Sequence, residues 1–142
     1  TFKLAAKKKN IKAILGVGDL ETMRNVAKAS LVCMMAGADF IKTSTGKETI
    51  NANLNNSLVM LRMIREFHEI TRKKIGFKPA GGISSAKLVI EFLILVLEEL
   101  GSEWINPKLL RIGASSLLID IERQLYHFAV GRYANKDKMA IG

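Results

Sequence analysis

Residues 38–47, which read Ala-Asp-Phe-Ile-Lys-Thr-Ser-Thr-Gly-Lys, place a lysine directly behind a short apolar segment. Phe40 and Ile41 are typical of a buried strand, and small polar residues with a glycine follow Lys42. A charged ammonium is poorly solvated inside a buried strand, so the position of Lys42 needs an explanation. It is either an amine nucleophile of the kind that forms Schiff bases with carbonyl compounds, or a strand-end lysine that reaches solvent on its aliphatic stem.

The rest of the chain repeats the order of a short apolar segment, a polar turn and an amphipathic helix. The predicted strands are residues 11–15, 40–42, 75–78 and 109–112. The predicted helices follow a cap at Asp19, begin near 51–54, follow a cap at Ser84 or Ser85, and follow Ser116. Strands that alternate with helices predict an α/β fold with a parallel sheet and right-handed crossovers. Ligands of such folds bind at the carboxyl ends of the strands.

The helix predicted between Ser85 and Gly101 is apolar around much of its circumference and is expected to be well covered. Residues 132–142 lose the helical period and are expected to form a loose C-terminal tail. A chain of 142 residues is the usual size of one domain, so we treat 1–142 as a single domain.

Composition excludes several classes of partner. The formal net charge is +9, but the basic residues are dispersed, and aromatic residues make up only 6% of the chain. No run interleaves the two types as a nucleic-acid platform would, so a basic nucleic-acid-associated module is the weakest interpretation. The longest apolar runs are too short to span a bilayer, which predicts no membrane partner. Cys33 lies among apolar residues, which favours a reduced, cytoplasmic compartment.

Three of the four predicted strands end in loops of similar composition. These loops contain Gly46 and Lys47, then Gly81 and Gly82, and then Gly113, Ser115 and Ser116. Glycines expose backbone N–H groups, and the N-terminus of each following helix adds partial positive charge, so together they can hold an anion. Three such loops at one edge of a sheet predict a phosphate-binding site.

Lys42 and Lys78 form the second signal, because both end a short strand and the two strands are consecutive. Neighbouring strands lie about 4.8 Å apart, so the two amines can approach to about 5 Å. At an effective dielectric constant of ~20 their repulsion is roughly 3 kcal/mol, which lowers the pKa of one of them. We expect a charged Lys78 and a neutral Lys42 that can attack an aldehyde.

The motifs GADFIKTSTGK (37–47), GFKPAGGI (76–83) and RIGASSLL (111–118), in this order and spacing, resemble the deoxyribose-phosphate aldolases. LEELGSEW (97–104) and IERQLYHFAVGRY (121–133) are similar to the animal members. The resemblance implies that Lys42 is the Schiff-base lysine and that Lys78 is the second lysine that lowers its pKa. It places Gly46, Lys47, Gly81, Gly82, Gly113, Ser115 and Ser116 on the phosphate side. A class I aldolase of this kind uses no metal and no cofactor.

The resemblance implies a (β/α)8 barrel of the TIM type, of which this chain supplies the C-terminal four βα units. The family's aspartate for proton transfer lies on an earlier strand and has no counterpart here. The family's usual arginine after the glycine pair is replaced by Ser84, and its usual threonine at the end of the first of these strands by Val17. A half-barrel leaves two open sheet edges, so we expect either a fragment whose N-terminal half is missing or, less readily, a homodimer of half-barrels.

The function implied is the aldol cleavage and synthesis of 2-deoxyribose 5-phosphate, to and from glyceraldehyde 3-phosphate and acetaldehyde. The implied partner is a small phosphorylated sugar. The alternative is a catalytically inactive fragment that binds a phosphosugar but lacks the half of the barrel that carries the aspartate.

Overall fold

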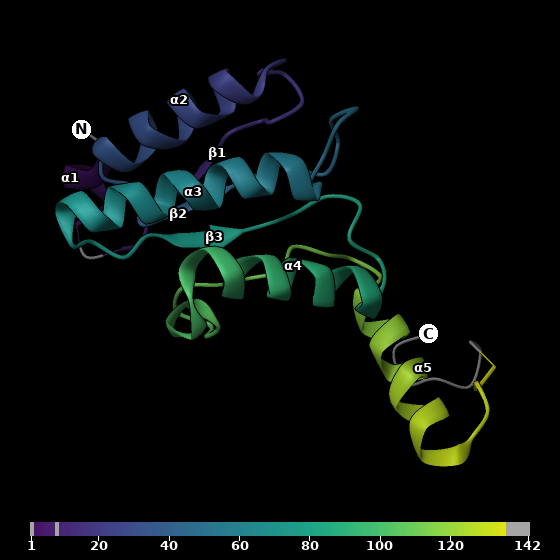
Figure 1. The fold of residues 1–142 in the computed structure, drawn as a ribbon. Helices are drawn as coiled ribbons and strands as arrows, with labels where there is room; N and C mark the ends of the chain where they lie inside the picture. The colour runs from purple at the N-terminus through teal and green to yellow at the C-terminus, as the bar shows by residue number, and fades with distance from the viewer. Residues whose placement is uncertain (1, 8, 136–142) are drawn as a thin grey trace.

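The computed structural model describes residues 2–7 and 9–135, and it alternates strands with helices as the sequence predicts. The elements, drawn in Figure 1, are α1 (Phe2–Ala6), β1 (Lys12–Ile14), α2 (Met23–Met35), β2 (Phe40–Lys42), α3 (Leu54–Thr71), β3 (Gly76–Lys78), α4 (Ala86–Leu100), the 3-10 helix η1 (Ser102–Trp104) and α5 (Leu117–Val130). The sequence did not predict the short helix α1 or the 3-10 helix η1. The ion pair of Lys3 with Asp39, 2.5 Å long, ties α1 to the segment before β2.

The three strands are parallel and lie in the order β1-β2-β3. Their register aligns Lys42 with Ile14 on one side and with Lys78 on the other. Side chains alternate between the faces of a sheet, so the residues of this row share one face. Ile41 and Phe77 lie on the opposite face and are fully buried.

The predicted fourth strand, residues 109–112, is not a regular strand. The segment runs parallel to β3, but it forms only isolated bridges, of Phe77 with Leu110 and of Ala80 with Gly113. Pro79 stands between these bridges and has no N–H with which to continue the ladder. Its carbonyl still accepts a 2.8 Å hydrogen bond from the Gly113 amide, so the fourth βα unit keeps its place without a continuous strand.

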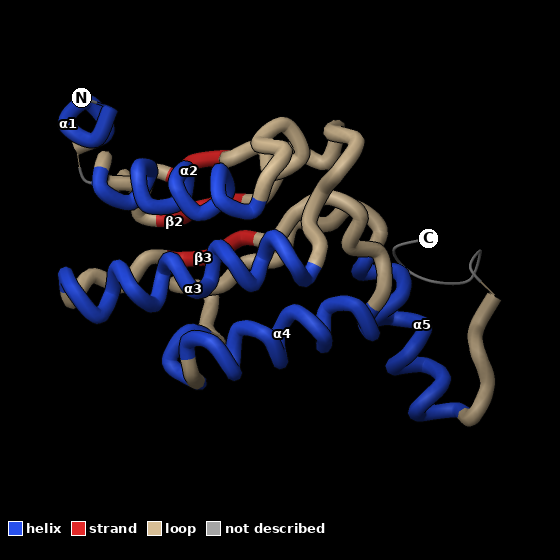
Figure 2. Tube along the Cα trace, turned by 45° about the horizontal axis from the view of Figure 1, so that its top comes forward, coloured by secondary structure: helices blue, strands red, loops and turns tan. Residues whose placement is uncertain are grey.

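Helices α2, α3 and α4 cover the Ile41 and Phe77 face of the sheet, with α3 packed between the other two (Figures 1 and 2). Buried apolar side chains from the sheet and these helices make one core. It includes Val26, Met34, Ile41, Met60, Leu61, Ile64, Phe77 and Val96. Trp104 closes one end of this core and donates a 2.9 Å hydrogen bond from its indole N–H to the carbonyl of Ile75.

The helix ends correct one prediction and confirm another. The N-cap of α2 is Thr22, whose hydroxyl accepts from the amide of Asn25, and not Asp19, which lies in the preceding turn. The N-cap of α4 is Ser85, whose hydroxyl accepts from the amide of Leu88. Gly37 ends α2 at φ +95°, in the left-handed region that favours glycine.

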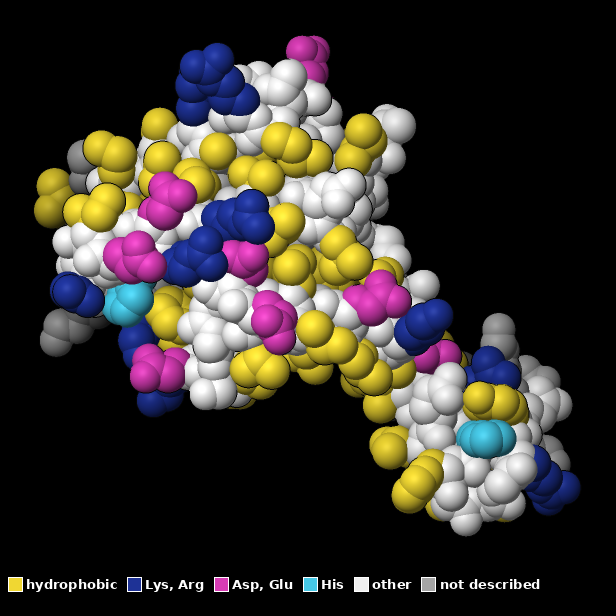
Figure 3. Space-filling view, viewed as in Figure 1, with side chains coloured by type: hydrophobic (Ala, Val, Ile, Leu, Met, Phe, Trp, Pro, Cys, Tyr) yellow, Lys and Arg dark blue, Asp and Glu magenta, His cyan; other side chains and the backbone are white. Residues whose placement is uncertain are grey.

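The prediction that α4 is well covered is wrong, because one side of it carries exposed apolar residues. Ile90 and Ile94 are 55% and 53% exposed. Helix α5 points away from the other helices in Figures 1 and 2, and its Leu125 and Phe128 are 63% and 91% exposed. Figure 3 shows apolar side chains along the edge of α4 that leads to α5. The fold leaves this side of the two helices without a neighbour among the described residues.

Of the predicted tail, residues 132–135 have no regular secondary structure, and residues 136–142 lie outside the described residues. Among the described residues, no helix is both long and apolar enough to cross a membrane.

Candidate functional site

The two lysines that the sequence singled out stand side by side at the carboxyl ends of β2 and β3. Lys42 and Lys78 are direct register partners, so their side chains leave the sheet on the same face. Both are half-buried. A Cβ added to Gly113 would lie 2.9 Å from Cε of Lys78, so the lysine stem passes directly over that glycine.

A cavity of about 450 Å³ opens beside Lys42 at this edge of the sheet. It brings together Lys42 and every residue predicted for the phosphate side, namely Gly46, Lys47, Gly81, Gly82, Gly113, Ser115 and Ser116. Thr45, Ala80, Ile83, Ser84 and Ala114 complete its lining. Three loops that are distant in the sequence thus form one site, whose wall is mostly backbone and small side chains.

Two buried hydroxyl groups, which the sequence did not single out, join the first two of these loops. Thr43 Oγ1 donates to the carbonyl of Ala80 at 3.0 Å and accepts from its amide at 2.9 Å. Ser44 Oγ approaches the same carbonyl at 2.6 Å and Oδ1 of Asn51 at 2.9 Å. The small polar residues that follow Lys42 in the sequence therefore fix the loop after β2 against the loop after β3.

Gly81 is one position in the cavity wall at which glycine is required. Its φ of +93° favours glycine, and a Cβ there would lie 2.5 to 2.7 Å from the side chain of Asn51. The close approach lets the loops after β2 and β3 touch, and this contact forms one wall of the cavity.

The carboxylate of Glu48 closes the turn that contains Gly46 and Lys47. It accepts hydrogen bonds from the amides of Thr45 and Gly46 and from Oγ1 of Thr45. These bonds, that from the Thr45 amide foremost, lower the pKa of Glu48 from 4.5 to about 2. Nothing in the sequence pattern singled out Glu48, because its partners lie in a turn whose geometry the sequence does not specify.

The third loop contributes two serines, Ser115 and Ser116, to the cavity. Ser116 is the N-cap residue of α5, yet its hydroxyl makes no capping hydrogen bond to the described part of that helix. Ser115 and Ser116 are both exposed in the lining of the cavity. Their hydroxyl groups are therefore available to a ligand at the start of α5, where the helix dipole favours an anion.

Two further cations, Lys12 and Arg111, lie over the ring of Phe40 on the same side of the sheet as the two lysines. Lys12 Nζ lies 5.6 Å from the centre of the Phe40 ring, and Cζ of Arg111 lies 4.8 Å from it. Partial burial lowers the pKa of Lys12, and the charges of Lys78, Arg111 and Lys42 lower it further. The sequence did not indicate this pair, because only the register shows that Lys12 shares a face with the two lysines.

Other titratable groups take packing roles. Burial raises the pKa of the Cys33 thiol, as expected of a small apolar residue. His68 packs edge-on against Trp104, and His127 stacks on Tyr133. A search of the described residues found no group of three or more His, Cys, Asp or Glu side chains that could hold a metal ion.

The fold and the cavity define an α/β protein with a cavity suited to a small anionic ligand at the carboxyl edge of a parallel sheet, beside a pair of lysines. A model of the DeoC/LacD family of aldolases matches residues 4–119, and the chain belongs to this family.

Curated relatives carry a more specific name. The chain is 60% identical over 133 residues to the deoxyribose-phosphate aldolases of Homo sapiens and Mus musculus. The alignment covers 94% of this chain and 42% of each relative. The chain thus spans about two fifths of the length of the curated relatives it matches.

Solved structures show the same partial coverage. A proposed deoxyribose-phosphate aldolase from Toxoplasma gondii ME49 superposes with a TM-score of 0.78 at 26% identity, covering 89% of this chain and 49% of that one. Another from Coccidioides immitis gives a TM-score of 0.59 at 27% identity, covering 80% and 38%. Most of this fold therefore recurs as part of larger structures that are named as deoxyribose-phosphate aldolases.

Proposed function

We propose that this chain carries the reacting lysine of an aldolase that cleaves and forms 2-deoxyribose 5-phosphate. The observation that carries the proposal is the register of Lys42 with Lys78 beside a cavity lined by three glycine-rich or serine-rich loops. The names of the human and mouse relatives support the choice of substrate.

In the cleavage direction, the amine of Lys42 attacks the aldehyde carbon of the open-chain sugar, and loss of water gives a protonated Schiff base. The iminium withdraws electrons, so the bond between the second and third carbons breaks as the hydroxyl on the third carbon gives its proton to a base, which we assign to the complementary half of the barrel. Glyceraldehyde 3-phosphate leaves with the new carbonyl group. The enamine that remains on Lys42 takes up a proton, and water then releases acetaldehyde and restores the amine.

Lys78 supports this chemistry through its charge. Lys78 lies in register beside Lys42 on the same face of the sheet, so its charge acts directly on the reacting amine. Lys12 adds to the positive charge on the same face.

The phosphate group of the substrate binds at the far side of the cavity. Lys47, next to Gly46, supplies the charge, the glycines at 81, 82 and 113 let the ligand approach the backbone, and the hydroxyl groups of Ser115 and Ser116 donate hydrogen bonds. Ser84 lines the same cavity and can add a neutral hydrogen bond but no charge.

We further propose that residues 12–130 correspond to the C-terminal half of a (β/α)8 barrel, with the complementary half supplied by the same enzyme. Among the described residues, β1 has a paired neighbour on one side only, and the apolar sides of α4 and α5 are open. The partial coverage of longer relatives supports completion from within one protein over pairing of two copies. The thiol of Cys33 suits a reduced compartment, and we assign the reaction to the cytoplasm.

Borohydride trapping tests the proposed reaction. The protein is incubated with 2-deoxyribose 5-phosphate, reduced with borohydride, and compared with the Lys42→Arg variant, which keeps the charge but cannot form the adduct. We expect a stable adduct in the unchanged protein and none in the variant. A ligand that raises the melting temperature of both without any adduct would instead support the phosphosugar-binding alternative.

A further inference from the structure

Several side-chain hydrogen bonds hold the loop between β2 and α3, and those at its tip come mainly from Glu48. Ser44 and Asn51 anchor its two ends to each other, 2.9 Å apart, and Asn51 Nδ2 donates to the carbonyl of Glu48 at 2.7 Å. The tip, residues 45–47, is held by the side chain of Glu48. Its carboxylate oxygens lie 3.0 Å from the Thr45 amide and 3.2 Å from the Gly46 amide.

Successive backbone amides that point to one place form a concave site for an anion. Here a carboxylate of the chain itself occupies that place. The amides of Thr45 and Gly46 are therefore already paired, and a phosphate in the cavity meets the side chain of Lys47 and the other two loops instead.

We propose that Glu48 is a positioning residue, whose carboxylate fixes residues 45–47 so that Lys47 stands on the cavity wall before the ligand binds. The inference rests on the proposed function of the cavity as a phosphate site. Since hydrogen bonds hold the pKa of Glu48 near 2, the carboxylate stays charged and the turn stays closed throughout the neutral range.

Two physical effects predict opposite results when the charge of Glu48 is removed. A carboxylate next to Lys47 repels phosphate, so electrostatics alone predicts tighter binding without it. A turn that is no longer held must be ordered by the ligand, which predicts weaker binding. Because Glu48 is only half-buried, water and salt still screen its repulsion, and we expect the loss of order to prevail.

The test compares the unchanged protein with Glu48→Gln, which keeps the shape of the side chain but cannot accept both amide bonds as a carboxylate does. Inorganic phosphate is titrated by calorimetry, and the rate of borohydride-trapped adduct formation on Lys42 is measured with acetaldehyde, which carries no phosphate. We expect the dissociation constant for phosphate to rise about tenfold. The rate with acetaldehyde should fall much less than phosphate affinity, because acetaldehyde carries no phosphate group for Lys47 to hold.

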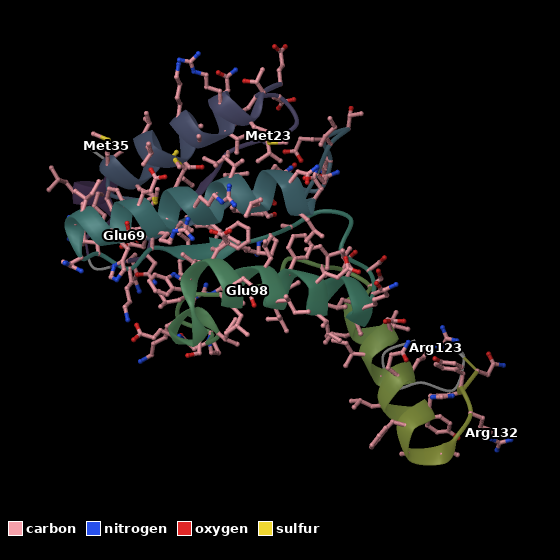
Figure 4. All side chains as sticks on the ribbon, in the orientation of Figure 1. Met23, Met35, Glu69, Glu98, Arg123 and Arg132 are labelled. Carbon is pink, nitrogen blue, oxygen red and sulfur yellow. The ribbon has the colours of Figure 1, made fainter. Side chains whose placement is uncertain are left out.

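Glu69→Gln is the matched control, since it removes the same charge from the opposite end of α3 (Figure 4). It should change neither readout. Tighter or unchanged phosphate binding in Glu48→Gln would overturn the role of Glu48, and so would an equal loss of both readouts, which would indicate general damage. If the unchanged protein binds phosphate and forms the adduct, such a result leaves the proposed function intact. If the unchanged protein does neither, the proposed function fails and this inference fails with it.

Discussion

The pair of Lys42 and Lys78 shows how the register of a sheet determines the chemistry of single residues. Each lysine ends a strand of three residues, and direct pairing of the two positions places both on the open face of the sheet. A shift of one residue would send one lysine into the helical core, where Ile41 and Phe77 lie. The pairing of two amines therefore depends on the same alternation that builds the core.

Gly113 makes room for Lys78, and this gives a prediction at the residue scale. A Cβ at Gly113 would lie 2.5 Å from Cβ of Ala80, closer than real side chains approach. We expect Gly113→Ala to lower the free energy of unfolding in urea by about 1–3 kcal/mol. Adding Ala80→Gly should recover part of the loss, because it removes the opposing methyl group. No recovery in the double variant would show that backbone conformation, rather than this contact, requires the glycine.

The sequence could identify the site residues that stand in continuous motifs, but not those that act through contacts made on folding. Lys42, Lys47 and the glycines stand in continuous motifs, so their neighbours in the chain carried the information. Lys12 and Glu48 act through contacts that depend on strand register and turn geometry, which no local pattern specifies. Their roles became visible only when the chain was folded.

At the scale of helices, Ser85 and Ser116 occupy the same N-cap position with different tasks. The hydroxyl of Ser85 caps α4, whereas that of Ser116 makes no such bond to the described residues of α5. We expect Ser85→Ala to cost about 1 kcal/mol of unfolding free energy in urea titration. Ser116→Ala should change stability by less than about 0.5 kcal/mol but weaken the binding of inorganic phosphate severalfold. Equal losses of stability in the two variants would contradict this division.

Asp39 links α1 to the sheet, and its contribution should depend on pH. Burial raises the pKa of Asp39, but hydrogen bonds from Lys3 and from the Ile11 amide, with the charge of Lys3, hold it below the ordinary value of 3.8. A lowered pKa means that the stabilisation is present above pH 3.8 and is lost as the pH falls through the lowered value.

The Asp39→Asn variant tests this link. Because the ion pair is about one third exposed, we discount its charge and expect a loss of about 1 kcal/mol at pH 7. Thermal unfolding should show that the difference from the unchanged protein shrinks as the pH falls below 4. A difference that stays constant between pH 7 and pH 3 would contradict the assignment.

Four βα units could be read from the sequence because apolar periodicity and glycine positions repeat in each. The sequence predicted a more regular fourth strand than the structure shows. Pro79 interrupts the hydrogen bonds of the segment beside it, so the sequence of that segment gives no sign of the effect. The cover of α4 was misjudged for a related reason. Apolar residues around a helix show that it can be buried, but not whether the chain at hand provides the neighbour.

At the scale of the whole molecule, the exposed apolar residues of α4 and α5 predict association. Surfaces of this kind on soluble proteins mark contacts with another surface. We expect sedimentation velocity to show association that grows with concentration, and the double variant Leu125→Lys with Phe128→Lys to reduce it without loss of helix content. Ile70→Lys is the control, because Ile70 is 83% exposed on α3, away from α5. Association that is equally strong in the double variant would place the contact elsewhere.

The most direct test of the account is the site and rate of adduct formation on Lys42. The protein is treated with limiting acetaldehyde and borohydride, and the modified lysines are located by peptide mass spectrometry. The account predicts modification concentrated on Lys42, with a rate at least about tenfold lower in Lys78→Met and unchanged in Lys73→Met, an exposed lysine beyond α3. Modification spread evenly over the exposed lysines, or a rate on Lys42 that does not depend on Lys78, would contradict it.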